Sequence, residues 1–378
     1  RMIYLGLLIF ALGSVVAALA DSIWAVILGR ALQGGGAVSA AVMALAADLT
    51  REEHRIKVMA FIGITIGLSF AVSMIMGPVL NGWIGVPGIF WLTGLFALLG
   101  MAVVRFQVPD PAVSRIHRDA EPVASQFGRV LFDGQLLRLN FGIFTLHLLL
   151  TATFVAVPLA LRDAGLASGK HWEVYLPALL FSMAAMVPFI IVAEKQHRLK
   201  PVFLGAILLL ALTEFGLLTL HDSVLEISLL MLAFFTGFNL LEATLPSLIA
   251  KMAPPDAKGT AMGVYSSSQF LGAFAGGALG GLLHGRVGLQ GVFAFATLGA
   301  LTWLLVAWTM RNPSYLSSYL LNVGALDEGQ AWDLAARLTQ VPGVAEAVVI
   351  AGDGVAYLKV DRHALDEAAL RAYAATER

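Results

Sequence analysis

The chain has 378 residues, of which 58% are hydrophobic and only 13% carry a charged side chain. Soluble domains average roughly 25% charged residues, so this chain has too little charge to coat a water-facing surface and is expected to be an integral membrane protein. A net charge of -1 gives no reason to expect a nucleic-acid partner. The sequence has no cysteine, which excludes disulfides, thiolate metal sites, cysteine nucleophiles and lipidation on cysteine.

Ten apolar segments approach or exceed the length of about 20 residues that a helix needs to cross a bilayer. The sequence predicts them at residues 2–20, 23–47, 57–81, 88–107, 137–161, 172–193, 201–220, 225–250, 259–284 and 289–310. Four of them precede residues 108–136, a proline-containing stretch of mixed charge that is expected to be a cytoplasmic linker. We therefore expect an N-terminal transmembrane half over 1–107 and a C-terminal half over 137–311.

The loops between these segments differ in basic charge, and the more basic loops of a membrane protein face the cytoplasm. One alternating set of loops holds most of the basic residues, namely Arg51, Arg55, Lys57, Arg105, Arg115, Arg118, Arg129, Arg138, Lys195, Arg198, Lys200, Lys251, Lys258 and Arg311. The other set holds Arg162, Lys170 and Arg286. The first set is therefore expected in the cytoplasm, and the C-terminus with it.

An internal repeat relates the two halves, because the stretch from Arg55 to Gly85 aligns without a gap with the stretch from Lys258 to Gly288. In this alignment Met59 falls on Met262, Gly77 on Gly280, Gly82 on Gly285 and Gly85 on Gly288. Transporters built from two parallel halves carry such a repeat. If the halves match, two further helices would precede Arg1, and without them the chain is not expected to transport.

The tail over 318–378 has the charge and periodicity of a soluble domain. Strands are predicted at Ser318–Val323, Val344–Ile350 and Val355–Val360, and helices at Glu328–Thr339 and Ala364–Ala374. Gly352-Asp353-Gly354 between the last two strands is a hairpin signal. The order β-α-β-β-α predicts a small α+β domain of ferredoxin-like type without its last strand.

Two ionisable residues mark the second apolar segment, where such groups are costly and usually functional. Arg30 and Gln33 lie one turn apart in a glycine-rich stretch and share a helix face. Arg30 is a candidate for a buried cation that senses or gates proton movement, and the alternative is an arginine that reaches the outer interface. Asp48 ends the same segment, where an ordinary solvated helix terminus is the alternative.

Glu242 lies in the middle of the eighth segment and shares a helix face with Asn239. A carboxyl group inside a membrane can take up and release a proton, which makes Glu242 a candidate proton carrier or cation ligand. The alternative is a protonated acid that is hydrogen-bonded between helices. Glu214 has the same chemistry but is the weaker candidate, because the repeat places it on a helix at the outside of the bundle.

Four further polar residues are candidates for a substrate cavity, namely His147, Asn239, Tyr265 and Gln269. A lone histidine or tyrosine in a membrane helix is more often a packing residue. Gly77 and Pro78 lie late in the third segment with Gly82, where proline bends the helix and glycine lets a neighbour approach. We expect a pliable packing seam between the halves there, with a simple structural kink as the alternative.

Catalytic and nucleotide-binding signatures are missing from the sequence. It has no phosphate-binding loop, no Gly-rich dinucleotide turn and no metal-ligand spacing, so no cofactor and no metal are expected. An enzyme is disfavoured because no nucleophile–base pair is found. The remaining energy source for transport is an ion gradient.

Two motifs carry a resemblance to a known family. Gly29-Arg30-Ala31-Leu32-Gln33-Gly34 resembles motif B of the major facilitator superfamily, and Gly77-Pro78 with Gly82 resembles its motif C, the antiporter motif. Motif C departs from the usual pattern, since Ser73 and Asn81 stand where glycines are usual. The resemblance covers essentially the whole chain and is closest to bacterial drug/proton antiporters that carry a C-terminal ferredoxin-like domain.

This resemblance implies a twelve-helix transporter of the bacterial inner membrane that works by alternating access. It implies that Asp48 pairs with an arginine of motif A, a loop that would end just before or at Arg1, and so holds the outward-facing state. The tail resembles heavy-metal-associated domains in strand order, but it lacks their paired cysteines, so binding of soft metals is excluded.

The expected function is secondary transport that exports a small organic compound in exchange for protons, by a monomer in the lipid bilayer. Substrate would lie between the halves, near Arg30, His147, Glu242 and Tyr265. The first alternative is a symporter that imports a metabolite with protons, which the direction of flux would separate. The second is a membrane sensor, in which the tail binds a ligand and the bundle no longer transports.

Overall fold

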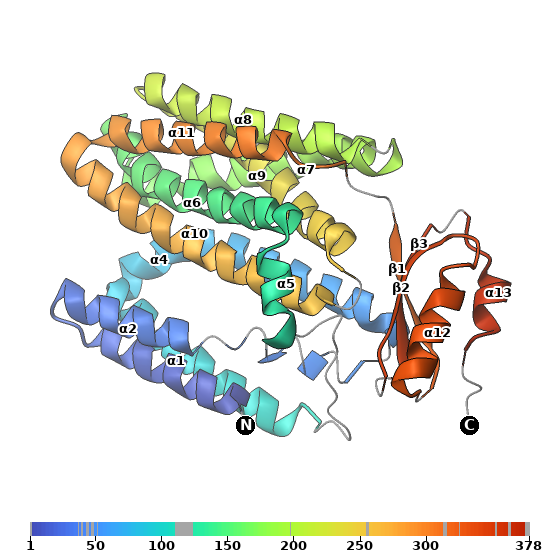
Figure 1. Ribbon diagram of the computed structural model, residues 1–378. Coiled ribbons are helices and arrows are strands. Elements are labelled where there is room, and N and C mark those ends of the chain that lie inside the picture. Colours follow the sequence, from blue (N-terminus) through green and yellow to red (C-terminus); the bar gives the residue numbers. More distant parts are fainter. Residues whose placement is uncertain are drawn as a thin grey trace. The chain divides into compact units, whose positions relative to one another are not determined.

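A computed structural model describes residues 2–36, 38, 41–42, 45–46, 49–50, 52–109, 124–196, 198–254, 257–312, 316–324, 326–351, 354–361 and 364–374. It consists of helices followed by a small sheet near the C-terminus (Figure 1). Within these ranges, six helices are long and apolar enough to cross a membrane. The chain divides into two compact units, Arg1–Ala120 with Leu166–Leu176 and Glu121–Gly165 with Pro177–Arg378.

The first unit is built on the close packing of α1 (Met2–Ala18) against α2 (Ile23–Gly35) and α4 (Glu52–Phe106). Gly13 and Gly29 face each other where α1 meets α2. A Cβ added to Gly13 would lie 2.6 Å from the Gly29 carbonyl oxygen, and one added to Gly29 would lie 2.8 Å from the Gly13 carbonyl oxygen. Only glycine fits at these positions, so the two backbones approach as closely as small residues in membrane helices allow.

The helix α2 is shorter than the predicted segment 23–47. It ends at Gly35, and the Gly36 amide closes it by donating to the Leu32 and Gln33 carbonyls. Three glycines stand in a row here, and glycine loses more backbone freedom in a helix than any other residue. The prediction of one continuous helix was therefore wrong at this glycine run. Residues 41–42 and 45–46, which the structure also describes, are helical.

The predicted segments 57–81 and 88–107 form one long element, α4, that is interrupted at Gly85. Gly85 has φ 67° and ψ 175°, a conformation outside the helical region. Glycine takes positive φ without the steric cost that a Cβ imposes, so it is the residue that lets the chain break here. The two predicted segments are thus present, separated by this single residue.

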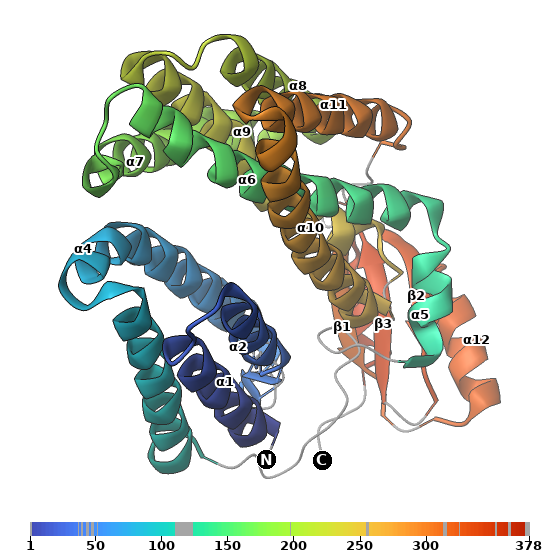
Figure 2. The same cartoon turned by 90° about the vertical axis from the view of Figure 1, so that its left-hand side faces the viewer.

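The second unit carries the other helices and the sheet. Its helical elements, with α7 counted from Pro177, are η1 (Ala124–Gln126), α5 (Phe127–Leu131), α6 (Gly134–Asp163), α7 (Trp172–Lys195), α8 (Leu199–Thr219), α9 (Val224–Met252), α10 (Lys258–Val287) and α11 (Leu289–Trp308). A short turn, η2 (Ser168–Lys170), precedes α7. In both views α10 runs beside α6, and α11 runs beside α8 (Figures 1 and 2).

Part of the expected linker over 108–136 is helical. The side chain of Asp133 accepts hydrogen bonds from two amides in the first turn of α6 and so fixes where that helix begins. Just before it, Val130 of α5 is fully buried. Thr260 of α10 donates a hydrogen bond of 3.3 Å to the Gln126 side chain of η1. The last part of this stretch therefore packs on the second unit.

The tail folds around its own apolar core. Its elements are β1 (Ser317–Asn322), α12 (Glu328–Leu338), β2 (Val344–Val349), β3 (Val355–Val360) and α13 (Glu367–Arg371). The strand β3 lies between β1 and β2 and is antiparallel to both, so β1 and β2 run parallel with α12 connecting them. Leu338 and Leu370 of the helices are fully buried against Leu358 of β3. This split β-α-β arrangement confirms the predicted ferredoxin-like fold class.

The last helix of the tail is shorter than predicted. A helix was expected over Ala364–Ala374, whereas α13 covers only Glu367–Arg371. The cause is Asp366, whose side chain accepts a hydrogen bond from the Ala369 amide and thereby starts the helix after it.

Candidate transport site

Three of the predicted site residues meet in the second unit, although they come from three different helices. The amide nitrogen of Gln269 on α10 lies 2.8 Å from Nε2 of His147 on α6. The same amide nitrogen donates a hydrogen bond of 3.4 Å to Oε1 of Glu242 on α9. His147 Nε2 and Glu242 Oε2 are themselves 4.0 Å apart. An acid and a base thus share one amide where three helices meet, with the His147 side chain 13% exposed and the Glu242 side chain 38% exposed.

The close packing of α6 and α10 brings Gln269 within reach of His147. Gly272, Gly276 and Gly280 recur at every fourth position of α10, so they lie along one face of that helix. A Cβ on Gly272 would collide with the Phe144 carbonyl of α6, and a Cβ on Gly276 would collide with the carbonyl of Leu148. The glycine seam therefore sets the spacing that the polar cluster needs.

The shared amide suits one tautomer of His147. A side-chain amide has two hydrogens, so Gln269 can donate one to His147 and one to Glu242. In this arrangement Nε2 of His147 is the unprotonated ring nitrogen, and the ring hydrogen lies on Nδ1, which has no hydrogen-bond partner among the described residues. A proton arriving at Nε2 would remove this acceptor and create a donor that faces Glu242 Oε2, an oxygen without a hydrogen-bond partner in the described residues. The cluster can therefore exist in two hydrogen-bonding states that differ by one proton.

Tyr265 extends the cluster by one turn of α10. It is 3% exposed, and its hydroxyl has no hydrogen-bond partner among the described residues. Tyr265 is close enough to Glu242 for the two side chains to interact electrostatically. Phe238 of α9 packs edge-on against the ring of His147, with 5.7 Å between ring centroids. A buried hydroxyl without a partner near an acid is a group that a bound ligand can satisfy.

Asn239 does not join this cluster, although it is on the same helix as Glu242. Its amide donates a hydrogen bond of 2.9 Å to the hydroxyl of Ser182 on α7. Ser182 is fully buried and donates in turn to the Leu179 carbonyl of its own helix. Asn239 therefore ties α9 to α7, while Glu242 faces α6 and α10. Ser182 was not predicted as a site residue, because a serine in an apolar helix is common.

A second polar network lies in the first unit. Arg30 donates a hydrogen bond of 2.6 Å to the side-chain oxygen of Gln33, and the Gln33 amide donates one of 2.6 Å to Ser14 of α1. Thr93 of α4 donates to the same serine oxygen over 3.3 Å. Gln33 is buried at the meeting point of three helices, whereas Arg30 is exposed. Gln33 thus joins α2 to its neighbours and holds Arg30 in place at its edge.

The structure shows fewer contacts for the other predicted site residues. Gly77, Pro78 and Gly82 lie in α4, before its break. Neither glycine would bring an added Cβ within 4 Å of another group in the part of the chain that the structure describes. The packing seam expected at this motif stays a prediction. Asp48 lies outside the described residues.

Glu214 is the most deeply buried acid of the described second unit, at 0% exposed. The hydroxyl oxygen of Thr153 on α6 lies 2.6 Å from Glu214 Oε1 and 2.7 Å from the Leu149 carbonyl oxygen. A hydroxyl has a single hydrogen, so both short contacts are satisfied when Glu214 carries a proton and donates to Thr153. Unlike Glu242, this acid has no base beside it in the described structure.

Comparison with known proteins agrees with this architecture. The profile of the Major Facilitator Superfamily matches residues 1–238 and, in a second overlapping match, 179–323. The inner membrane transport protein YajR of Escherichia coli K12 is 45% identical over 357 residues, which are 94% of this chain and 78% of that protein. The multidrug resistance protein MdtH of Aeromonas hydrophila is 26% identical over 200 residues, 51% of this chain and 50% of that protein.

A solved structure shares the fold. The crystal structure of a bacterial homologue of the human lysosomal transporter Spinster, in an inward-facing and unoccupied conformation, superposes with a TM-score of 0.60. The two sequences are 12% identical, and the match covers 82% of this chain and 83% of that one. The predicted fold class and the resemblance to this family are therefore confirmed: the chain belongs to the Major Facilitator Superfamily and is a multi-pass secondary transporter of the inner membrane.

Proposed function

We propose that this transporter exports small organic compounds in exchange for protons, and that the cluster of His147, Gln269 and Glu242 carries the coupling proton. The observation that supports the proposal most directly is the shared amide between an acid and a base inside membrane-spanning helices. The relationship to MdtH, which is named a multidrug resistance protein, supports the substrate class.

The two hydrogen-bonding states of the cluster provide a mechanism for coupling. With His147 unprotonated, Gln269 bridges it to Glu242 and ties α6, α9 and α10 together. Protonation breaks one of these bonds, and the three helices then prefer a different arrangement. A ligand or proton that stabilises one arrangement shifts the equilibrium between inward-facing and outward-facing states by its difference in affinity.

The other predicted residues take supporting roles in this proposal. Arg30 and Gln33 stabilise the first half through their hydrogen-bond network. The positive charge of Arg30 also contributes to the electrostatic potential along the path of the proton. Asp48 holds one of the two states, as its place in the family pattern implies. Gly77 and Pro78, with Gly82, provide the packing seam along which the halves change position.

Proteoliposomes that contain the full-length protein and a pH-sensitive dye test the proposal. Organic cations, neutral drugs and sugars are added in turn. Proton movement opposite to an added compound is the expected result. Proton movement in the same direction would instead establish a symporter that imports its substrate.

Glu242→Gln should make transport independent of the proton gradient while the protein still folds. Glu226→Gln is the matched control, because Glu226 lies in the first turn of the same helix and away from the cluster. A Glu242→Gln protein whose pH dependence equals that of the wild type would remove Glu242 from the mechanism.

The tail and the orientation complete the proposal. We place the C-terminus in the cytoplasm, because the loops richer in lysine and arginine belong to the same side as the tail. A monomer is sufficient for the mechanism.

Deletion of residues 318–378 should leave transport intact if the tail is accessory. The sensor function would be favoured if the full-length protein does not transport but responds to a ligand, and if deletion of the tail removes that response.

A further inference from the structure

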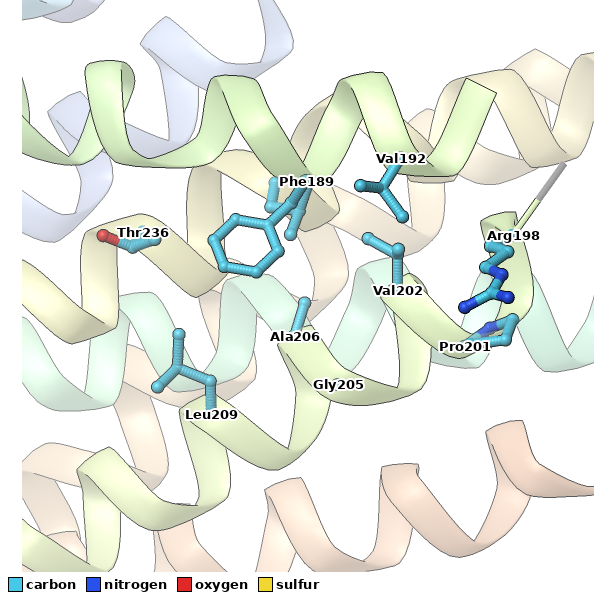
Figure 3. A pocket seen from close by; sticks show the side chains of 10 residues that line it. Phe189, Val192, Arg198, Pro201, Val202, Gly205, Ala206, Leu209 and Thr236 are labelled. Carbon is cyan, nitrogen blue, oxygen red and sulfur yellow. The ribbon is translucent and has the colours of Figure 1, made fainter. Parts of the chain in front are cut away.

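An apolar groove of about 440 Å³ lies between α7, α8 and α9, away from the polar cluster. One face of α8 forms its floor, with Arg198, Pro201, Val202, Gly205, Ala206 and Leu209 at successive turns. Phe189 and Val192 of α7 form one wall (Figure 3). The groove exists because α7 approaches α8 and α9 less closely than those two helices approach each other.

The groove is apolar along its length and charged at one end. Figure 3 places Arg198 and Pro201 at one end, and Leu209 and Thr236 toward the other. Thr236 uses its hydroxyl hydrogen within its own helix, by donating to the Leu232 carbonyl over 2.8 Å. Arg198 is the only charged residue among those that line the groove. It forms no ion pair within the part of the chain that the structure describes.

The dimensions match one leaflet of a membrane. From Arg198 to Leu209 the lining stripe extends about 16 Å along the axis of α8. A bilayer has a hydrocarbon core of about 30 Å, so one leaflet contributes about 15 Å. The arginine belongs to a loop at the end of a membrane helix, which is the level where lipid headgroups lie. The groove therefore offers an apolar channel one leaflet deep with a cation at the headgroup level.

We propose that this groove binds an anionic phospholipid, with one acyl chain along α8 and the headgroup phosphate at Arg198. A guanidinium forms strong, charge-assisted hydrogen bonds with phosphate oxygens, often two at once. Basic residues between membrane helices recognise anionic headgroups in the same way. The acyl chain gains contact with Val202, Ala206 and Leu209, and Gly205 leaves room for it because an added Cβ there would meet nothing within 4 Å.

The test uses the full-length protein in detergent and native mass spectrometry. The protein is loaded with phosphatidylglycerol or with phosphatidylcholine of the same acyl chains, and retention of bound lipid is compared. The wild type should retain phosphatidylglycerol about tenfold better, because the phosphate of either lipid can accept from Arg198 but the choline ammonium of phosphatidylcholine is repelled by it. Arg198→Gln should remove this preference. Arg162→Gln is the charge-matched control, since the Arg162 side chain is 62% exposed in the last turn of α6 and does not line the groove, and it should behave as the wild type.

A second pair of variants tests the acyl-chain channel. Gly205→Leu fills the groove without a backbone clash and should lower retention of both lipids, with an unchanged melting temperature. Gly281→Leu places the same side chain at another open helical position and should have no effect. Glycerol 3-phosphate, which has the headgroup chemistry but no chains, should not displace bound lipid. Equal retention of both lipids by the wild type, a preserved preference in Arg198→Gln, or displacement by glycerol 3-phosphate would overturn the proposal.

Discussion

Gly85 and Gly288 share one backbone conformation, although they belong to opposite halves of the chain. Their φ angles are 67° and 77°, and their ψ angles are 175° and -163°. Each stands where one helix ends and the next begins. The gapless alignment of the two halves pairs these same two glycines, so the internal repeat in the sequence has a counterpart in the backbone.

The correspondence continues into the next turn. A Cβ added to Gly88 would lie 2.5 Å from Cβ of Ile84, and one added to Gly291 would lie 2.7 Å from Cβ of Val287. These four residues keep the same offset as Gly85 and Gly288. The bend after each left-handed glycine brings the start of the next helix against the end of the previous one, and it needs a second glycine three residues later.

Substitution of Gly288 by alanine should destabilise the protein. A residue with a Cβ held at φ 77° and ψ -163° costs about 1–3 kcal/mol, so the melting temperature of Gly288→Ala in detergent should fall. Gly285→Ala is the control, because Gly285 is helical and an added Cβ there meets open space. Alanine in a helix is favoured over glycine by about 0.5–1 kcal/mol, so this variant should melt at or above the wild-type temperature. Equal melting of the two variants would show that the bend tolerates a side chain.

Two neighbouring glycines of α10 should respond in opposite directions. A Cβ at Gly276 would collide with the Leu148 carbonyl of α6, whereas a Cβ at Gly277 would meet nothing within 4 Å. Overpacking typically costs about 1–3 kcal/mol, so Gly276→Ala should lower both the melting temperature and the folded fraction. Gly277→Ala should be neutral or stabilising. A neutral Gly276→Ala would mean that α6 and α10 can separate without loss, contrary to the role given to the seam.

The sequence predicts the helices well and their ends less well. Apolar runs set where helices form, so the segments of the second half and the strands of the tail are found close to their expected places. The predicted helix ends are wrong where a glycine or a capping side chain ends or starts a helix within an apolar segment. The glycines at 34–36 end α2 early, and the cap at Asp366 starts α13 late. The sequence alone does not show whether a glycine run or a capping residue will interrupt a helix that the apolar pattern predicts.

The candidate site was predictable residue by residue but not as a cluster. His147, Glu242 and Gln269 are each unusual in an apolar helix, which is why the sequence marks them. Nothing in the sequence states that they face one another, since that depends on how three helices rotate and pack. Asn239 illustrates the limit: it shares a face with Glu242 by spacing, yet it bonds to Ser182 of another helix.

Gln269→Leu tests whether the shared amide is needed for coupling. The variant removes the donor that joins His147 and Glu242 but leaves both titratable groups in place. Transport should continue, while the ratio of transport with and without a proton gradient should fall toward one. Ser268→Ala is the control, because the Ser268 hydroxyl donates only to the Val264 carbonyl of its own helix. A gradient ratio equal to the wild type in Gln269→Leu would show that the acid and the base act without the bridge.

Glu214 and Glu242 are both acids in membrane helices, and they have different neighbours. Both short contacts of the Thr153 hydroxyl are satisfied when Glu214 carries a proton, and no base lies beside Glu214 in the described residues. An amide donates to Thr153 in the same way, and Glu214→Gln should therefore keep both the melting temperature and the response to the proton gradient. Glu214→Ala removes the buried hydrogen bond to Thr153 and leaves a cavity in its place, which should cost about 1–3 kcal/mol.

The comparison of Glu214→Gln with Glu242→Gln, in liposomes at two internal pH values, separates the two acids. The same chemical change should be silent at Glu214 and should abolish the gradient response at Glu242, because only Glu242 has His147 and Gln269 as partners. The reverse pattern would identify Glu214 as the proton carrier. The cluster of His147, Gln269 and Glu242 would then only contribute to packing. The proton carrier is the acid whose substitution removes coupling, and in that case it would be Glu214, although Glu242 is the acid that lies beside a base.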